Sequence, residues 1–138
     1  MKLIDLYESE GLEKAKAFVR KLYSRGHPNP FGGGTFFNLK GDNDEEGLVK
    51  VLLHPMGNGT VHISELISTD YQGKGFGSYV LKIITDLADK EDITLNLFAK
   101  PISVRDKKDI PLNKLISFYK KAGFKSGKVK QEMIREPK

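Results

Sequence analysis

The residue types best suited to chemistry gather in one glycine-rich run, Gln72-Gly73-Lys74-Gly75-Phe76-Gly77. Apolar residues alternate over 61–68 and follow helical spacing over 79–88, so the run lies between a predicted strand and a predicted helix. A glycine-rich turn that opens a helix presents unpaired backbone N–H groups at the positive end of the helix dipole. Such a turn binds phosphate without a cationic side chain. The sequence therefore predicts a phosphorylated ligand at this turn.

Two familiar phosphate loops do not fit the run. A P-loop requires a glycine, four residues and then Gly-Lys-Ser/Thr, and no segment supplies that pattern. The dinucleotide fingerprint requires G-x-G-x-x-G, whereas the glycines at 73, 75 and 77 give G-x-G-x-G. The run instead resembles the signature Q/R-x-x-G-x-G/A of the GNAT superfamily of N-acetyltransferases, with Gln72, Gly75 and Gly77 at its three fixed positions.

A second segment, 115–124, resembles the other recurrent motif of that superfamily, a helix that ends in F-Y-x-x-x-G-F. Phe118 and Tyr119 open the motif, and Gly123 fits the position that closes a helix in a left-handed conformation. Because both motifs occur in the order that the family uses, the chain is similar to the GNAT superfamily over most of its length.

The resemblance implies an α/β class with a mixed sheet, in a GNAT-like three-layer fold. Its central sheet is mostly antiparallel, with splayed central strands and flanking helices, and residues 1–138 form one domain. Hydrophobic periodicity predicts the elements themselves. The expected strands are 2–7, 35–39, 48–54, 61–68, 93–99 and 129–135, and the expected helices are 10–23, 79–88 and 114–122. The prolines at 28 and 30 predict irregular structure after the first helix.

The resemblance also implies acetyl-CoA as the co-substrate and no metal. Its pantetheine arm is expected to lie along Leu66, Ile67 and Ser68. Its pyrophosphate is expected on the loop that follows, which comprises Gln72, Gly73, Lys74, Gly75, Phe76, Gly77 and Ser78. Two plainer interpretations stay open: the glycines could form a tight turn without a ligand, and Lys74 could be a solvated surface charge.

Two residues are candidates for catalysis. Tyr119 matches the family tyrosine that stands near the coenzyme sulfur as a general acid, and its alternative is a tyrosine packed in the core. Glu65 is the candidate base, acting directly or through water, and its alternative is a glutamate in a salt bridge or at an exposed edge. Strict alternation places Glu65 on one face with Ile63 and Ile67, and His62 on the opposite face.

The implied reaction is acetyl transfer to a primary amine by direct attack in a ternary complex. The chain has no cysteine, which excludes a cysteine-linked acyl-enzyme, a disulfide and a thiolate metal site. A sensor or partner-inhibiting module that binds acetyl-CoA without turnover is the alternative on the same fold. The sequence does not identify the acceptor, which is either a small molecule or a protein.

Bulk properties bound the remaining expectations. The net charge is +5, but no aromatic-interleaved basic stripe or nucleic-acid motif is legible, so nucleic acid is not expected as a partner. The N-terminal residues lack the apolar core of a signal peptide, and no stretch is long enough to cross a membrane. We therefore expect a cytoplasmic monomer or homodimer that has no membrane partner.

Overall fold

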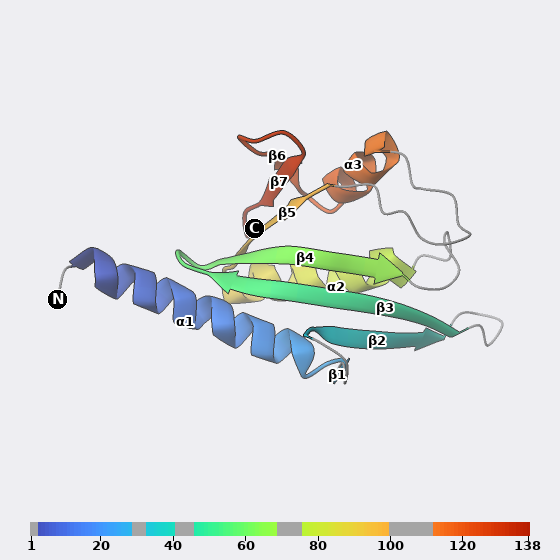
Figure 1. Cartoon of the computed structure of the whole chain (residues 1–138), viewed down its shortest axis with the longest axis horizontal. Coiled ribbons are helices and arrows are strands. Elements are labelled where there is room, and N and C mark those ends of the chain that lie inside the picture. Colours follow the sequence, from blue (N-terminus) through green and yellow to red (C-terminus); the bar gives the residue numbers. More distant parts are fainter. Residues whose placement is uncertain (1–2, 29–32, 41–45, 69–75, 100–111) are drawn as a thin grey trace.

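The computed structural model describes residues 3–28, 33–40, 46–68, 76–99 and 112–138. Within these residues the strands form one open, seven-stranded sheet in the order β1-β2-β3-β4-β5-β7-β6 (Figure 1). Every neighbouring pair is antiparallel except β4 and β5, which are parallel. The strands are β1 His27–Pro28, β2 Thr35–Lys40, β3 Glu46–Met56, β4 Thr60–Ser68, β5 Thr94–Phe98, β6 Lys125–Ser126 and β7 Glu132–Arg135. The helices are α1 Leu3–Tyr23, α2 Phe76–Glu91 and α3 Leu112–Lys121.

The hairpin of β3 and β4 is closed by a turn that suits the twist of its strands. Asn58 and Gly59 have φ values of 60° and 67°, and the Thr60 amide donates to the Gly57 carbonyl over 3.3 Å. Asparagine and glycine adopt positive φ readily, and positive φ in the turn suits the right-handed twist of hairpin strands. Helix α1 crosses this turn so closely that a Cβ at Gly11 would lie 2.6 Å from the Asn58 nitrogen. Gly11 therefore allows α1 to pack against the hairpin end.

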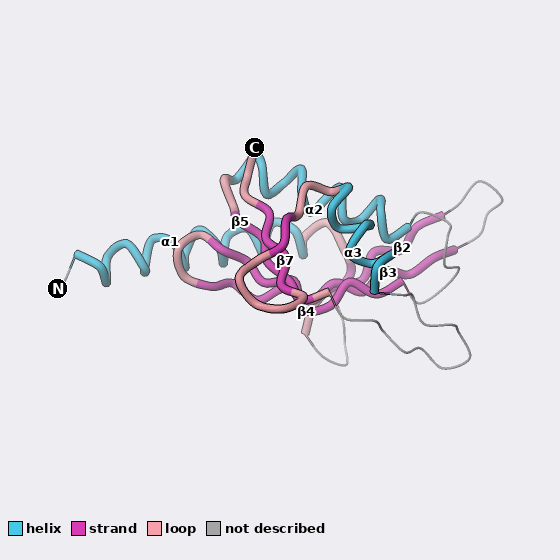
Figure 2. Tube along the Cα trace, turned by 90° about the horizontal axis from the view of Figure 1, so that it is seen from above, coloured by secondary structure: helices cyan, strands magenta, loops and turns pink. Residues whose placement is uncertain are grey.

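The core lies on one face of the sheet. Alternate strand residues are buried there together with apolar residues of α1, α2 and α3. Figure 2 shows the three helices on the same side of the strands. We call this side the core face and the opposite side the outer face. No helix of the described part covers the outer face.

One buried ion pair ties the C-terminal elements to α2. The Arg135 guanidinium, only 4% exposed, donates to both carboxylate oxygens of Asp89 over 2.8 and 2.9 Å. Its Nε also donates to the Ala122 carbonyl beyond α3, over 2.8 Å. The hydrogen bonds from Arg135 hold the pKa of Asp89 below its ordinary value. Arg135 thus fixes β7, α2 and the end of α3 relative to one another.

The fold class expected from the sequence is confirmed, with a mixed, mostly antiparallel sheet whose central strands separate. The described helices supply one layer beside the sheet, and the layer expected on the other face is not seen among them. The expected first strand, 2–7, is wrong, because α1 begins at Leu3 and runs unbroken to Tyr23. The spacing of Leu3, Leu6 and Tyr7 also fits one face of a helix. The weak alternation of apolar residues over 2–7 therefore predicted a strand where the helical period applies. Strands β1 and β6 were not expected, and β1 forms where proline restraint predicted irregular structure.

Among the described residues, no helix is long and apolar enough to span a bilayer.

Candidate functional site

The central feature of the site is the separation of β4 from β5. Their parallel register holds for three pairs only and ends at His62 opposite Asn96. Strand β4 continues to Ser68, still paired with β3 on its other side. Strand β5 continues beside β7 instead. From Ile63 onward, the side of β4 that faces β5 therefore has no strand partner among the described residues.

A β-bulge in β4 lies next to the point of separation. Leu52 pairs with Glu65 whereas Leu53 pairs with Ile63, so Ser64 is an extra residue on β4. Bulges bend a strand and increase its local twist. The bulge therefore helps β4 to leave β5 immediately after their last pair.

The bulge also changes which side chains share a face. Residues that are paired across a ladder point to the same side of the sheet. Ile63 points to the core face with Leu53, and both are at most 4% exposed. Glu65, paired with Leu52, points to the outer face, as does His62. The expectation that Glu65 shares a face with Ile63 and opposes His62 is therefore wrong, because alternation was counted through an unseen extra residue.

Glu65 forms an ion pair on the outer face. Its Oε2 lies 2.9 Å from the Lys50 Nζ, and the side chains of Glu65 and Lys50 are 35% and 30% exposed. The Oε2 atom itself is enclosed and has no aligned hydrogen-bond donor among the described residues. The salt bridge that the sequence left open as an alternative is thus present. Because Oε2 is enclosed against Lys50, an incoming group can deliver a proton only to the other carboxylate oxygen, Oε1.

The structure places the expected pantetheine contacts on the separated part of β4. Leu66 packs against the core and pairs with Val51, whereas Ile67 is half-buried and pairs with Lys50 on the outer face. The backbone of both residues borders the separation from β5. Ser68 ends β4, and its side chain lies outside the described residues.

Most of the glycine-rich run also lies outside the described residues, namely Gln72, Gly73, Lys74 and Gly75. Helix α2 begins at Phe76, as the phosphate-loop interpretation requires, although the Phe76 side chain is not described. Ser78 is exposed in the first turn of α2. Among the described residues, a Cβ at Gly77 would meet nothing closer than the Phe118 Cζ, at 4.0 Å. Packing against the described residues therefore does not demand a glycine at 77.

Tyr119 lies in α3 and is buried. Only 7% of the residue is exposed, and its ring makes edge contacts with Phe118 and Phe124 at centroid distances of 5.1 and 5.6 Å. Burial raises the pKa of the Tyr119 hydroxyl to about 12. The hydroxyl consequently stays protonated at neutral pH and can only enter chemistry as a hydrogen-bond or proton donor to a strong base.

The end of α3 has the geometry that its sequence predicts. Gly123 has a φ of 99°, its amide donates to the Lys120 carbonyl, and the Phe124 amide donates to the Tyr119 carbonyl. These two bonds form the Schellman motif that closes helices at a left-handed glycine. The motif turns the chain so that Phe124 packs back on Tyr119, which fixes the tyrosine ring.

Comparison with known proteins relates the fold to solved structures. The anti-CRISPR protein AcrVA5 shares it with a TM-score of 0.52 at 21% sequence identity, over 75% of this chain and 98% of AcrVA5. An acetyltransferase of Bacillus subtilis, solved in complex with CoA, aligns with a TM-score of 0.46 at 16% identity, over 88% of this chain and 84% of that one. No protein-family profile and no curated protein sequence matches the chain. At this identity the likeness to AcrVA5 shows the fold alone.

Three residues around the site were missed by the sequence analysis. Lys50 pairs with Glu65, and Asn96 contacts His62 at the last rung between β4 and β5. The Tyr23 hydroxyl donates to the Leu53 carbonyl and accepts from the Leu53 amide, beside the bulge. Alternation along 48–54 could have placed Lys50 beside the strand of Glu65, but only the register shows that the two meet.

Among the described residues, no group of three or more histidine, aspartate, glutamate or cysteine side chains could hold a metal ion.

Proposed function

We propose that this protein is an N-acetyltransferase that moves the acetyl group of acetyl-CoA to a primary amine by direct attack in a ternary complex. The observation that carries the proposal is the separated strand β4, whose side toward β5 has no strand partner among the described residues from Ile63 on. An extended amide chain such as the pantetheine arm can hydrogen-bond to such a strand edge as an added strand would.

The start of α2 supports the same assignment. It follows β4 in the chain, and the N-terminal amides of a helix attract an anion. A glycine within a helix costs about 1 kcal/mol relative to alanine, yet no described residue would crowd a side chain at Gly77. A glycine at this position allows a pyrophosphate to approach the backbone closely, because there is no Cβ in the way.

Within this proposal the side chains have the following roles. The amine nitrogen attacks the thioester carbon, the carbon–sulfur bond breaks, and the amine loses a proton. Glu65 accepts that proton directly or through water, with Lys50 holding its carboxylate in place. Tyr119 donates to the departing thiolate, and its high pKa means that it stabilises the thiolate chiefly through a hydrogen bond.

The acceptor, in this proposal, is an amine of a small molecule or a protein. No side chain of the described part selects between the two. Turnover is tested by following thiol release from acetyl-CoA with a panel of small primary amines and lysine-containing peptides. Amine-dependent release is expected. Acetyl-CoA binding without release from any amine would contradict catalysis and leave a binding module.

Binding of acetyl-CoA is tested by calorimetry on a pair of matched variants. Gly77→Asp adds a carboxylate in the first turn of α2. The helix dipole stabilises a negative charge there, but the carboxylate repels a pyrophosphate. Gly57→Asp makes the same change in the β3–β4 turn, where a Cβ would meet nothing within 4 Å. We expect wild-type affinity for Gly57→Asp and at least about tenfold weaker binding for Gly77→Asp. Equal affinities of the two variants would remove the start of α2 from the site.

A further inference from the structure

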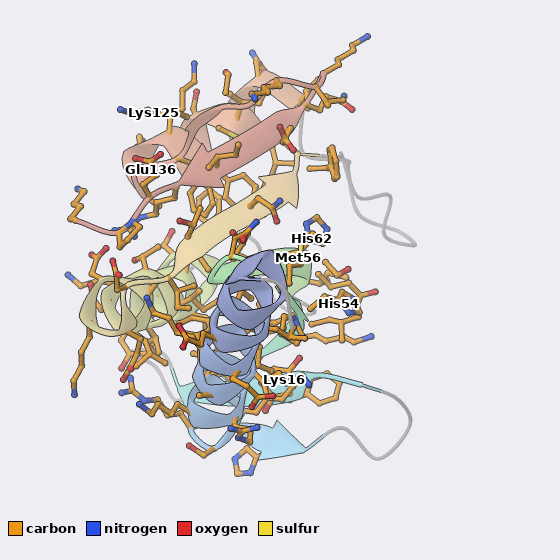
Figure 3. The ribbon with its side chains drawn as sticks, turned by 90° about the vertical axis from the view of Figure 1, so that its left-hand side faces the viewer. Lys16, His54, Met56, His62, Lys125 and Glu136 are labelled. Atoms are coloured by element: carbon orange, nitrogen blue, oxygen red, sulfur yellow. The ribbon has the colours of Figure 1, made fainter. Side chains whose placement is uncertain are left out.

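Two of the chain's three histidines form a cross-strand pair on the outer face. His54 of β3 and His62 of β4 are direct partners in the antiparallel ladder, so their side chains point to the same side. Cβ atoms of such partners are roughly 5 Å apart. His54 is exposed and His62 is half-buried. Figure 3 shows both side chains, with Met56, on one side of the ribbon.

The His62 ring is oriented by β5. Its Nδ1 lies 2.9 Å from the Oδ1 of Asn96, which is its partner in the parallel register. In the tautomer with the proton on Nδ1, His62 donates to this amide oxygen and the lone pair is on Nε2. The two ring nitrogens point in divergent directions, so Nε2 does not share the Asn96 contact.

Such an arrangement is the one that metal-binding histidines use. A ligating imidazole commonly donates its other ring N–H to a carbonyl or carboxylate oxygen, which fixes the tautomer and the ring orientation. The Phe98 ring adds a second restraint, with its centroid 5.8 Å from that of His62. Asn96 and Phe98, both on β5, thus restrain the orientation of the His62 ring.

Met56 supplies a third donor near the pair. It lies on β3 two residues after His54, on the same face, and its partner Thr60 lies two residues before His62. Met56 is therefore a diagonal neighbour of His62, within reach of a long side chain. Met56 is 44% exposed, so its thioether is accessible from solvent. Its flexible thioether can turn toward the two imidazoles.

We propose that His54, His62 and Met56 form a binding site for copper(I). Imidazole nitrogens bind copper among other transition metals, and a soft thioether ligand selects copper(I) over harder cations. Calcium and magnesium require oxygen ligands, and structural zinc sites require four donors drawn from thiolate, imidazole and carboxylate. The site has two imidazoles and no thiolate or carboxylate among these three residues, so it favours copper(I) over zinc. This copper(I) site does not depend on the proposed acetyl transfer.

The test is an anaerobic titration of the intact protein with copper(I), in competition with the colorimetric chelator bicinchoninate. We expect His54→Gln and His62→Gln each to weaken copper(I) binding by at least about tenfold. His27→Ala is the control, since His27 is exposed on β1 and is the only other histidine of the chain. Its affinity should equal that of the wild type.

Met56→Leu keeps the size and apolar character of the side chain, and so removes the thioether without disturbing the fold. It should weaken copper(I) binding by about tenfold. Histidine ring NMR signals provide a second measurement, because copper(I) is diamagnetic. The signals of His54 and His62 should shift together up to one equivalent while those of His27 stay fixed. Equal effects of His27→Ala and His54→Gln, or equal affinities of the wild type and the His54→Gln/His62→Gln variant, would overturn the proposal.

Discussion

Tyr119 combines two properties that single tyrosines seldom combine, a fixed ring and a strongly held proton. The ring is locked between Phe118 and Phe124, and the hydroxyl has a pKa of about 12. Tyr119→Phe should therefore leave acetyl-CoA affinity unchanged and lower turnover on the order of 10²-fold, since a positioned donor to the leaving group is lost. Calorimetry and thiol release measure the two quantities.

The control for that variant is Tyr79→Phe, which removes one hydroxyl from a tyrosine that is 58% exposed on α2. Its turnover should stay at the wild-type value. If Tyr119→Phe turned over as fast as Tyr79→Phe, Tyr119 would be a core residue only, which is the alternative that the sequence left open.

Because of the raised pKa of the Tyr119 hydroxyl, we expect the free energy of unfolding to fall at alkaline pH. The unfolded chain releases the Tyr119 proton near pH ~10, whereas the folded protein keeps it up to about 12. The folded state then binds more protons, so its advantage is fully present below pH ~10 and is lost as the pH rises to about 12. Two pKa units correspond to about 3 kcal/mol of unfolding free energy.

Urea unfolding of the wild type and Tyr119→Phe across this pH range measures that loss. Tyr23, whose pKa is also raised by burial, contributes equally in both proteins. The stability of Tyr119→Phe should fall less steeply with pH. Parallel curves for the two proteins would show that the Tyr119 hydroxyl is not desolvated.

At the scale of elements, the contact between α1 and the β3–β4 turn depends on a missing side chain. Gly11→Ala should normally stabilise a helix by up to about 1 kcal/mol. Here the new Cβ would lie 2.6 Å from the Asn58 nitrogen, so the helix must move away from the hairpin. We expect a net loss of about 2 kcal/mol.

The control is Gly57→Ala in the same turn, because a Cβ there meets nothing within 4 Å. Chemical denaturation should show a change within about 0.5 kcal/mol for this variant. A Gly11→Ala protein as stable as the wild type would mean that α1 does not pack on the turn as described.

The elements also show what the sequence could and could not reveal. Periodicity located β3, β4, α2, β5 and α3 because each has a long apolar pattern of a single period. The bulge at Ser64 has no such signal, since an inserted residue leaves the local pattern intact and only the pairing with β3 exposes it. Because the extra residue Ser64 was not detected, Glu65 and His62 were expected on opposite faces of the sheet, whereas they lie on the same face.

At the scale of the whole molecule, local features could be predicted from the sequence, whereas the packing of distant elements could not. Gly123 closes α3 as predicted, because a left-handed glycine cap is a local property. The face that each helix covers is not local, and α1, α2 and α3 were found together on the core face. The partner of Glu65 is likewise a matter of register between strands, which is why Lys50 was not foreseen.

The central claim is that acetyl-CoA lies along the separated part of β4 with its pyrophosphate at the start of α2. Titration of the isotope-labelled protein with acetyl-CoA, followed through its backbone amide NMR signals, tests this claim most directly. We predict that the amides of Glu65, Leu66, Ile67, Gly77 and Ser78 shift, while those of the distant edge strands β1 and β6 do not. Unchanged spectra at millimolar acetyl-CoA, or shifts confined to residues outside β4 and α2, would contradict the account.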